Sequence, residues 1–151
     1  ANRILPSLIG SNRRTAGDII VNMPDFGVYH RYAANFPWHS HAAWFITQMY
    51  RWGQIEQPVN IREAAQAAYD TGLYRDVARS LGVPYPLVDE KPEGGRDHPW
   101  VLTQASEPIA FGPGKFIDGR VFDPADPVTY IEGFERHRLM VGVDALRDLN
   151  P

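Results

Sequence analysis

An uncharged, aromatic-rich run at residues 36–50 constrains the fold of this chain more than any other feature. Ser40 is a suitable N-cap and Gly53 a suitable C-terminal stop, so the run predicts a helix over residues 41–52. One apolar stripe recurs at helical spacing and consists of Ala42, Phe45, Ile46, Met49 and Trp52. Further apolar bulk lies off this stripe, and a helix that is apolar nearly all round is normally buried on several sides. We therefore expect this helix at the centre of the core.

Two further helices are predicted to follow along the chain. Asn60 and Glu63 form a capping-box-like pair that opens a helix through the alanines after them. Thr71 is a candidate cap for the next helix, which Gly82 ends. This last helix has apolar residues at four-residue spacing, namely Leu73, Val77 and Leu81. The three helices form a helical block over residues 40–82, and its short connections predict antiparallel or crossing neighbours.

The rest of the chain predicts little regular structure. Proline makes up 13 of the 151 residues, about 9% against an average of about 5%. Residues 84–115 have no helical or strand periodicity and predict an irregular Pro/Gly-rich arm that is extended rather than packed. Residues 116–151 predict a closing hairpin with Asp118-Gly119 as its type I′ turn, followed by short helices that begin at Asp126-Pro127.

These elements predict a mostly helical α/β fold in three parts. Residues 1–83 form the helical lobe segment and also contain a weak strand signal at residues 18–23. The arm over 84–115 and the closing part over 116–151 complete the chain. An irregular stretch as long as the arm is unusual inside a compact domain. We therefore expect the chain to be one part of a larger fold, in which the 41–52 helix has neighbours outside this chain.

Charge and cysteine content exclude several classes of partner and site. Lys and Arg number 15 against 18 Asp and Glu, for a net charge of −3, so we expect no nucleic-acid partner. The chain has no cysteine, which excludes a disulfide framework and a cysteine nucleophile but leaves the compartment open. The first residue is not methionine and no leader pattern follows it, so we expect a mature product or a fragment.

His39 and His41, with Ser40 between them, are the first polar residues to consider as a site. Side chains at i and i+2 of a helix point about 200° apart, so the imidazoles do not converge there. His30 and Asp25 could add ligands, but the chain has no His-x-x-x-His or Glu-x-x-His spacing. Gly-x-Ser-x-Gly is also absent. We therefore predict no metal, no cofactor and no catalytic residue, and hence a protein that is not an enzyme.

Other polar and aromatic groups favour structural roles. Three carboxylates lack the spacing of a calcium loop and favour turns; they are Asp118, Asp123 and Asp126. Residues 112–115 read Gly-Pro-Gly-Lys but lack the rest of a phosphate-binding loop. The tryptophans are Trp38, Trp44, Trp52 and Trp100. They could form a ligand platform, but most lie on or beside the 41–52 helix, which favours core packing.

Arginine supplies the candidate binding group. Arg51 and Arg31 lie close to the aromatic region, and Arg13 and Arg14 form an adjacent basic pair. A guanidinium can hold a small oxyanion through two parallel hydrogen bonds. We therefore keep Arg51 as the candidate anion-binding residue. The alternatives for Arg51 are a solvent-facing position and a salt bridge between two lobes.

The run from Asn35 to Gln54 resembles the C-terminal third of nitrate- and bicarbonate-type solute-binding proteins of ABC transporters; it reads Asn-Phe-Pro-Trp-His-Ser-His-Ala-Ala-Trp-Phe-Ile-Thr-Gln-Met-Tyr-Arg-Trp-Gly-Gln. Further blocks are similar in the same order, at residues 4–10, 70–75, 81–84, 116–119 and 122–130. The resemblance implies the C-terminal portion of a two-lobed, periplasmic-binding-protein-like fold that closes on an oxyanion. Because the family's pocket lies largely upstream of this portion, no pocket residue is carried over.

The resemblance also implies a function. It implies a fragment of a solute-binding protein for nitrate, nitrite or bicarbonate, located in the periplasm and serving an ABC permease. The alternative within the same family is a cytoplasmic nitrate or nitrite sensor, or a regulatory protein-interaction module with its own partner. In either case the oxyanion would bind through upstream sequence, and exposed apolar surface would allow a homo-oligomer.

Overall fold

The computed structural model describes residues 11–13, 20–22, 28–135 and 138–151. The chain consists of two compact units, Ala1–Asn35 and Phe36–Pro151. Among the residues considered above, Asp25 and Arg14 lie outside the described residues.

The described residues of the first unit form a short strand pair and a turn of 3₁₀ helix. Strand β1 (Ser11–Arg13) runs antiparallel to β2 (Ile20–Asn22). Strand β2 lies inside the strand predicted at residues 18–23, and the ends of that prediction lie outside the described residues. The helical turn η1 spans Arg31–Ala33.

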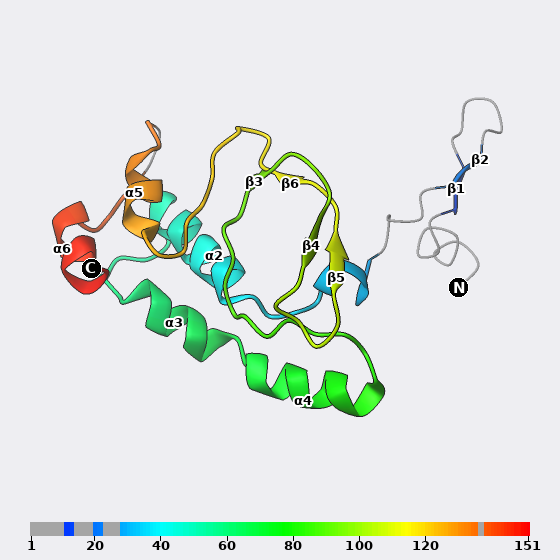
Figure 1. The fold of residues 1–151 in the computed structure, drawn as a ribbon. Coiled ribbons are helices and arrows are strands. Elements are labelled where there is room, and N and C mark those ends of the chain that lie inside the picture. Colours follow the sequence, from blue (N-terminus) through cyan, green and yellow to red (C-terminus); the bar gives the residue numbers. More distant parts are fainter. Residues whose placement is uncertain (1–10, 14–19, 23–27, 136–137) are drawn as a thin grey trace. The chain divides into compact units, whose positions relative to one another are not determined.

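The second unit is mostly helical. Its helices are α2 (His39–Arg51), α3 (Ile61–Ala68), α4 (Thr71–Leu81), α5 (Pro127–Glu132) and α6 (Val143–Leu149). Helix α2 packs against α3 and α5, and α5 packs against α6. Helices α3 and α4 follow each other nearly end to end (Figure 1). No helix in the described part of the chain is long and apolar enough to cross a membrane.

The core lies where α2, α3, α5 and α6 meet. Its buried members are Ala42, Ala43, Tyr50, Ile61, Ala65, Phe122, Val128, Tyr130, Ile131, Phe134, Val141 and Leu146. The two alanines of α2 leave room for its neighbours to approach closely, and larger side chains from α3, α5 and α6 fill the space between the helices. The predicted central position of this helix is confirmed by these contacts.

The face that α2 buries differs from the predicted stripe. The helix begins at His39 instead of after Ser40, and its buried residues are His39, Ser40, Ala42, Ala43, Thr47 and Tyr50. Three bulky members of the predicted stripe are exposed, namely Phe45, Met49 and Trp52. The prediction of this face was wrong because α3 and α5 pack on the other side of the helix. Gly53 follows with a φ of 69°, as predicted for the stop.

Local capping signals fix the other helix ends. The Asn60 side chain accepts a hydrogen bond from the Glu63 amide at 3.1 Å, which confirms the predicted cap of α3. Helix α4 is capped by Asp70 and not by Thr71: the Asp70 carboxylate accepts a hydrogen bond from the Leu73 amide at 2.8 Å. Gly82 ends α4 in the left-handed conformation, as predicted.

The apolar row predicted on α4 points to solvent. It consists of Leu73, Val77 and Leu81, all exposed. The buried residues of this helix are instead Thr71 and Ala78. Four-residue spacing therefore identified the helix correctly, and the residues that mark this spacing are exposed.

The stretch predicted as an extended arm is folded back on itself. Strand β3 (Gly95–Arg96) pairs antiparallel with β6 (Gly114–Lys115), and β4 (Trp100–Leu102) pairs antiparallel with β5 (Ile109–Phe111). Within the second pair, Leu102 lies opposite Ile109 and both are buried. These strands are two or three residues long, too short to leave an alternating pattern in the sequence.

The predicted hairpin at residues 116–122 is a turn without flanking strands that pair with each other. The Gly119 amide donates to the Phe116 carbonyl at 2.9 Å, while Phe122 pairs with Glu93. A type I′ turn needs a positive φ at both central residues; Gly119 has one, at 70°, and Asp118 does not. The following helix α5 begins as predicted, with Asp126 accepting from the Thr129 amide.

Candidate functional site

Buried polar side chains gather at the N-terminus of α2. His39 and Ser40 are buried there, and His41 is half-buried. The free amides of a helix N-terminus carry partial positive charge and favour nearby carboxylates. The first turn of α2 contains no acidic residue. Carboxylates are supplied instead by the folded-back stretch after α4, through Asp89 and Glu93.

Glu93 lies at the centre of this cluster, with only 12% of its side chain exposed. Its Oε1 accepts a hydrogen bond from the Ser40 hydroxyl at 2.7 Å and lies 3.3 Å from Nε2 of His41. Its Oε2 is paired with the Lys91 ammonium. The Glu93 backbone also exchanges two hydrogen bonds with Phe122. Glu93 therefore links the start of α2 to the segment that leads into α5.

The electrostatics of Glu93 favour the ionised form. Burial on its own would raise the pKa of Glu93. The hydrogen bond from His41 and the charge of Lys91 outweigh burial, so this pKa lies below its usual value. Glu93 is therefore a carboxylate at neutral pH, and an ionised carboxylate that is matched in this way is a poor general acid or base.

A second ion pair lies beside the first. Nη2 of Arg75 on α4 lies 2.6 Å from Oδ1 of Asp89, and Nε of Arg75 donates to the Pro86 carbonyl at 2.8 Å. The His39 amide donates to the Asp89 carbonyl at 2.9 Å. Burial raises the pKa of Asp89, but hydrogen bonds from Thr71 and Arg75 outweigh it and lower this pKa.

The two histidines contact different groups, as the helix geometry predicts. Nε2 of His39 lies 3.1 Å from the Tyr69 carbonyl, whereas His41 faces Glu93. Within the described residues, no group of three His, Cys, Asp or Glu could hold a metal ion. Every buried side-chain nitrogen and oxygen in the same residues has a hydrogen-bond partner. The cluster at the start of α2 is therefore suited to holding segments together.

Arg51, the candidate from sequence, lies at the other end of α2. Its guanidinium carbon is 3.7 Å from the centroid of the Phe134 ring and 4.6 Å from that of Trp52. Its Nη1 donates to the Gln48 side chain at 3.3 Å. These contacts place the charge of Arg51 among aromatic rings at the C-terminal end of the helix. An anion-binding role for Arg51 stays a prediction.

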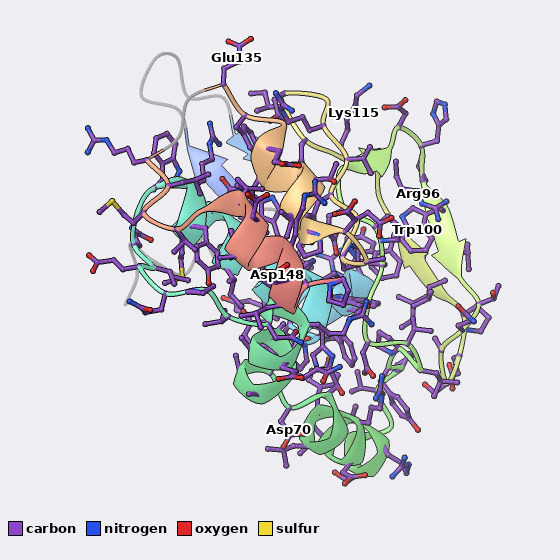
Figure 2. The ribbon with its side chains drawn as sticks, turned by 90° about the vertical axis from the view of Figure 1, so that its left-hand side faces the viewer. Asp70, Arg96, Trp100, Lys115, Glu135 and Asp148 are labelled. Atoms are coloured by element: carbon purple, nitrogen blue, oxygen red, sulfur yellow. The ribbon has the colours of Figure 1, made fainter. Side chains whose placement is uncertain are left out.

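The four tryptophans lie in the second unit, where Trp38 and Trp100 both contact the Phe111 ring and Trp44 contacts the Phe116 ring. Trp38 is buried, and Nε1 of Trp44 donates to the Tyr130 hydroxyl at 3.1 Å. Trp52 is exposed. Trp100 stacks on Phe111 with ring centroids 4.6 Å apart, and Arg96 lies beside it (Figure 2).

The acidic and glycine-rich candidates belong to turns and strands. Asp118 accepts from the Arg120 amide, Asp123 from the Ala125 amide and Asp126 from the Thr129 amide. Residues 112–115 lead into and form strand β6, where Lys115 pairs with Asp97 at 2.9 Å. These hydrogen bonds and pairs account for the charged groups without a ligand.

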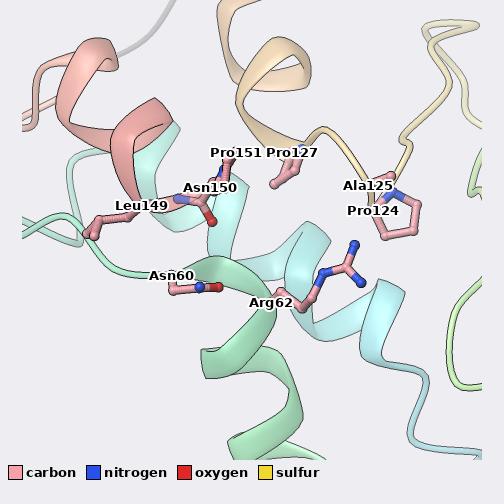
Figure 3. Close-up of a pocket in the computed structure, with 8 residues that line it drawn as sticks. All are labelled: Asn60, Arg62, Pro124, Ala125, Pro127, Leu149, Asn150 and Pro151. Atoms are coloured by element: carbon pink, nitrogen blue, oxygen red, sulfur yellow. The ribbon is translucent and has the colours of Figure 1, made fainter.

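A small cavity of about 160 Å³ opens between α3, α5 and the C-terminal residues (Figure 3). Its lining consists of Asn60, Arg62, Pro124, Ala125, Pro127, Leu149, Asn150 and Pro151. Asn60 caps α3. The Asn150 side chain accepts a hydrogen bond from the Ile61 amide and donates to the Val59 and Leu146 carbonyls. Arg62 extends from α3 toward Pro124. A single guanidinium faces a lining of prolines and satisfied amides, which is not the converging donor set that an oxyanion requires.

A second, more open cavity of about 500 Å³ lies along α5. Its lining includes Arg120 but also two carboxylates, Asp123 and Asp126. Carboxylates on the lining oppose the binding of an anion. Neither cavity includes Arg51 or the cluster around Glu93.

Two connecting residues were missed by reasoning from sequence. Glu93 is 53 positions from its partner Ser40, and Asn150 is 89 positions from Ile61. Both partners are remote in the chain, so no local motif marks them. The one local signal is the Lys91-x-Glu93 spacing, which on extended backbone places both side chains on one side.

Comparison with known proteins identifies distant relatives. No protein-family model and no solved structure matches the chain. It is 32% identical over 114 residues to the nitrate import ATP-binding protein NrtC of Synechocystis sp., an alignment covering 76% of this chain and 14% of that protein. It is 26% identical over 102 residues to the nitrate/nitrite binding protein NrtA of the same organism, covering 68% and 19%.

A third relative extends the comparison to bicarbonate. The chain is 27% identical over 130 residues to the bicarbonate transport ATP-binding protein CmpC of Synechococcus elongatus, covering 84% of this chain and 16% of that protein. The chain therefore spans less than a fifth of the length of these three relatives. The resemblance to nitrate and bicarbonate transport proteins is confirmed as a distant similarity.

Proposed function

We propose that this chain is a piece of a binding protein for a small oxyanion, namely nitrate, nitrite or bicarbonate, that serves an ABC transporter in the periplasm. The observation that carries the proposal is the similarity to two kinds of transport protein. One kind is named for binding nitrate and nitrite, and the other for binding ATP in nitrate or bicarbonate transport. A chain similar to both corresponds to a segment that both kinds contain.

The shared segment is better assigned to oxyanion binding than to ATP binding. Nucleotide hydrolysis in ABC transporters needs a phosphate-binding loop, and residues 112–115 lack its spacing and its following helix. Strand β6 and a turn occupy that place instead. The proposed role is non-catalytic, in line with the matched carboxylates around Glu93.

Within such a protein, we assign this chain a structural part. Neither described cavity presents several donors that converge on one point. The hydrogen bonds of Glu93 and Asp89 join helices to the folded-back stretch. The oxyanion would bind mainly to residues of a longer polypeptide, with Arg51 as the one candidate contribution from this chain.

Thermal unfolding with and without anions tests the proposal. A ligand that binds only the folded state raises its stability by about 2.7 kcal/mol at a hundredfold excess over Kd. We expect nitrate, nitrite or bicarbonate to raise the melting temperature of the longest natural polypeptide that contains this chain. Sulfate and chloride at equal ionic strength are the controls. A melting temperature that none of the three anions raises more than the controls would exclude the proposed function.

A further inference from the structure

One side of α2 is left uncovered within the described residues. Phe45, Met49 and Trp52 are 54%, 41% and 50% exposed, and their spacing places them on one side of the helix. Met140, 63% exposed, continues this surface, because its Cγ lies beside Gly53, the residue after Trp52. We call these four residues the α2 face. The opposite side of the helix packs on α3 and α5.

The edge of the α2 face is positively charged. Arg51 lies over the Trp52 ring, and Arg138 is exposed where its amide donates to the Arg51 carbonyl at 2.7 Å. Helix α2 carries no carboxylate. A complementary surface therefore needs apolar side chains for the four residues and a carboxylate near Arg138.

We propose that the α2 face is the docking surface for another segment of the longer polypeptide, and that this segment presents apolar side chains beside a carboxylate. The inference rests on the proposed function, since it takes the chain as part of a longer binding protein. The relatives provide the length for such a segment, because the chain spans 14% to 19% of them. Aromatic rings contribute most to interface energetics, and methionine is common at binding surfaces.

A second copy of the chain fits this surface less well. In a symmetric dimer each α2 face would meet the same face of the partner. An identical α2 has no carboxylate to pair with Arg138. The row on α4 gives no comparable indication of a partner, since charges of both signs, Arg79 and Asp76, already pair beside it.

Cysteine labelling tests the docking surface directly, because the chain has no native cysteine. Met49→Cys places a thiol on the α2 face, and Asp118→Cys places a control thiol on an exposed turn. Phe45→Cys repeats the test in case Met49→Cys perturbs folding. The alkylation rate of each thiol is measured by peptide mass spectrometry in this chain and in the longest natural polypeptide that contains it.

We expect the Met49→Cys thiol to react as fast as the control in this chain, and at least about tenfold slower than the control in the longer polypeptide. In the longer polypeptide, adding Arg138→Glu should increase the rate at Met49→Cys, whereas Arg138→Lys should not. Equal rates in both polypeptides would overturn the inference. Slow labelling of Met49→Cys in this chain alone would also overturn the inference. Protection that is lost on dilution would identify a second copy as the partner, and protection that persists in the monomer would show that the chain itself covers the α2 face.

This test and that of the proposed function fail separately. A protected α2 face in a longer polypeptide that binds no anion would support the docking surface and contradict the proposed function. Anion binding by a longer polypeptide with an unprotected α2 face would support the proposed function and contradict the docking surface.

Discussion

Replacing Glu93 with glutamine tests whether the cluster at the start of α2 holds the second unit together. In the Glu93→Gln variant, the new amide keeps an oxygen that can accept from Ser40, but it leaves the Lys91 ammonium without its carboxylate. Breaking a fully buried pair costs about 3–5 kcal/mol. Lys91 is 16% exposed, and the variant keeps the hydrogen bond from Ser40. We therefore expect the free energy of unfolding to fall by about 2 kcal/mol.

Urea unfolding followed by tryptophan fluorescence measures this loss, because all four tryptophans lie in the second unit. With a slope of about 2 kcal/mol per molar urea, the midpoint should fall by about 1 M at pH 7. The matched control is Glu107→Gln, at an exposed glutamate. It should change stability by less than about 0.5 kcal/mol.

The pH dependence gives a sharper criterion. Because the folded-state pKa of Glu93 is lowered, its ionisation stabilises the fold above the unfolded pKa of about 4.3. That contribution is lost as the pH falls through the folded-state value. The difference between wild type and Glu93→Gln should therefore shrink below about pH 4.3. A difference that is absent at pH 7, or that persists unchanged to pH 3, would refute the reasoning.

Four further substitutions test the packing around α2, α3 and α4. Asn150→Ala removes three hydrogen bonds, among them one to the Ile61 amide, and should lower the free energy of unfolding by about 2 kcal/mol in urea; an unchanged midpoint would contradict this. Gly53→Ala places a Cβ 2.6 Å from the Arg138 carbonyl oxygen, at a residue whose φ is +69°. This variant should lose about 2 kcal/mol or more of its free energy of unfolding, which a lower melting temperature would show. Leu73→Ser, on the exposed row of α4, should cost less than about 0.5 kcal/mol, whereas Ile61→Ala in the core should cost about 2–5 kcal/mol; similar losses for both would show that the α4 row is buried.

Helix existence and helix ends could be predicted from sequence because their signals are local. Asn60, Gly82 and Asp126 act within three or four residues of themselves, and each does in the structure what its position predicts. The predicted cap of α4 was Thr71 and the observed cap is Asp70, so the prediction was wrong by one residue. Such errors are expected because both side chains can accept the same amide hydrogen bond.

The buried faces could not be predicted in the same way. Apolar spacing on α2 and α4 selects the residues that could be buried, but the neighbouring elements decide which of them are. On α2, the small Ala43 and the polar Thr47 and Tyr50 face the core, while the bulkier Phe45 and Met49 do not. Such a choice depends on α3 and α5, which no window along α2 contains.

The cluster around Glu93 could not be predicted from the sequence either, because its members are remote from one another along the chain. Its sequence surroundings are rich in proline, glycine and charge, which favours an irregular segment. Only the fold brings this carboxylate to the N-terminus of α2, 53 positions away along the chain. Charge along the sequence indicates that carboxylates are present, but not which helix end they approach.

The most direct test of the proposed function is a calorimetric titration of nitrate, with bicarbonate and sulfate alongside, into this chain and into the longest natural polypeptide that contains it. Our account predicts saturable binding of nitrate or bicarbonate by the longer polypeptide and none by residues 1–151 alone. Absence of binding by both would contradict an oxyanion-binding protein, and equally tight binding by the chain alone would contradict its assignment as a structural part.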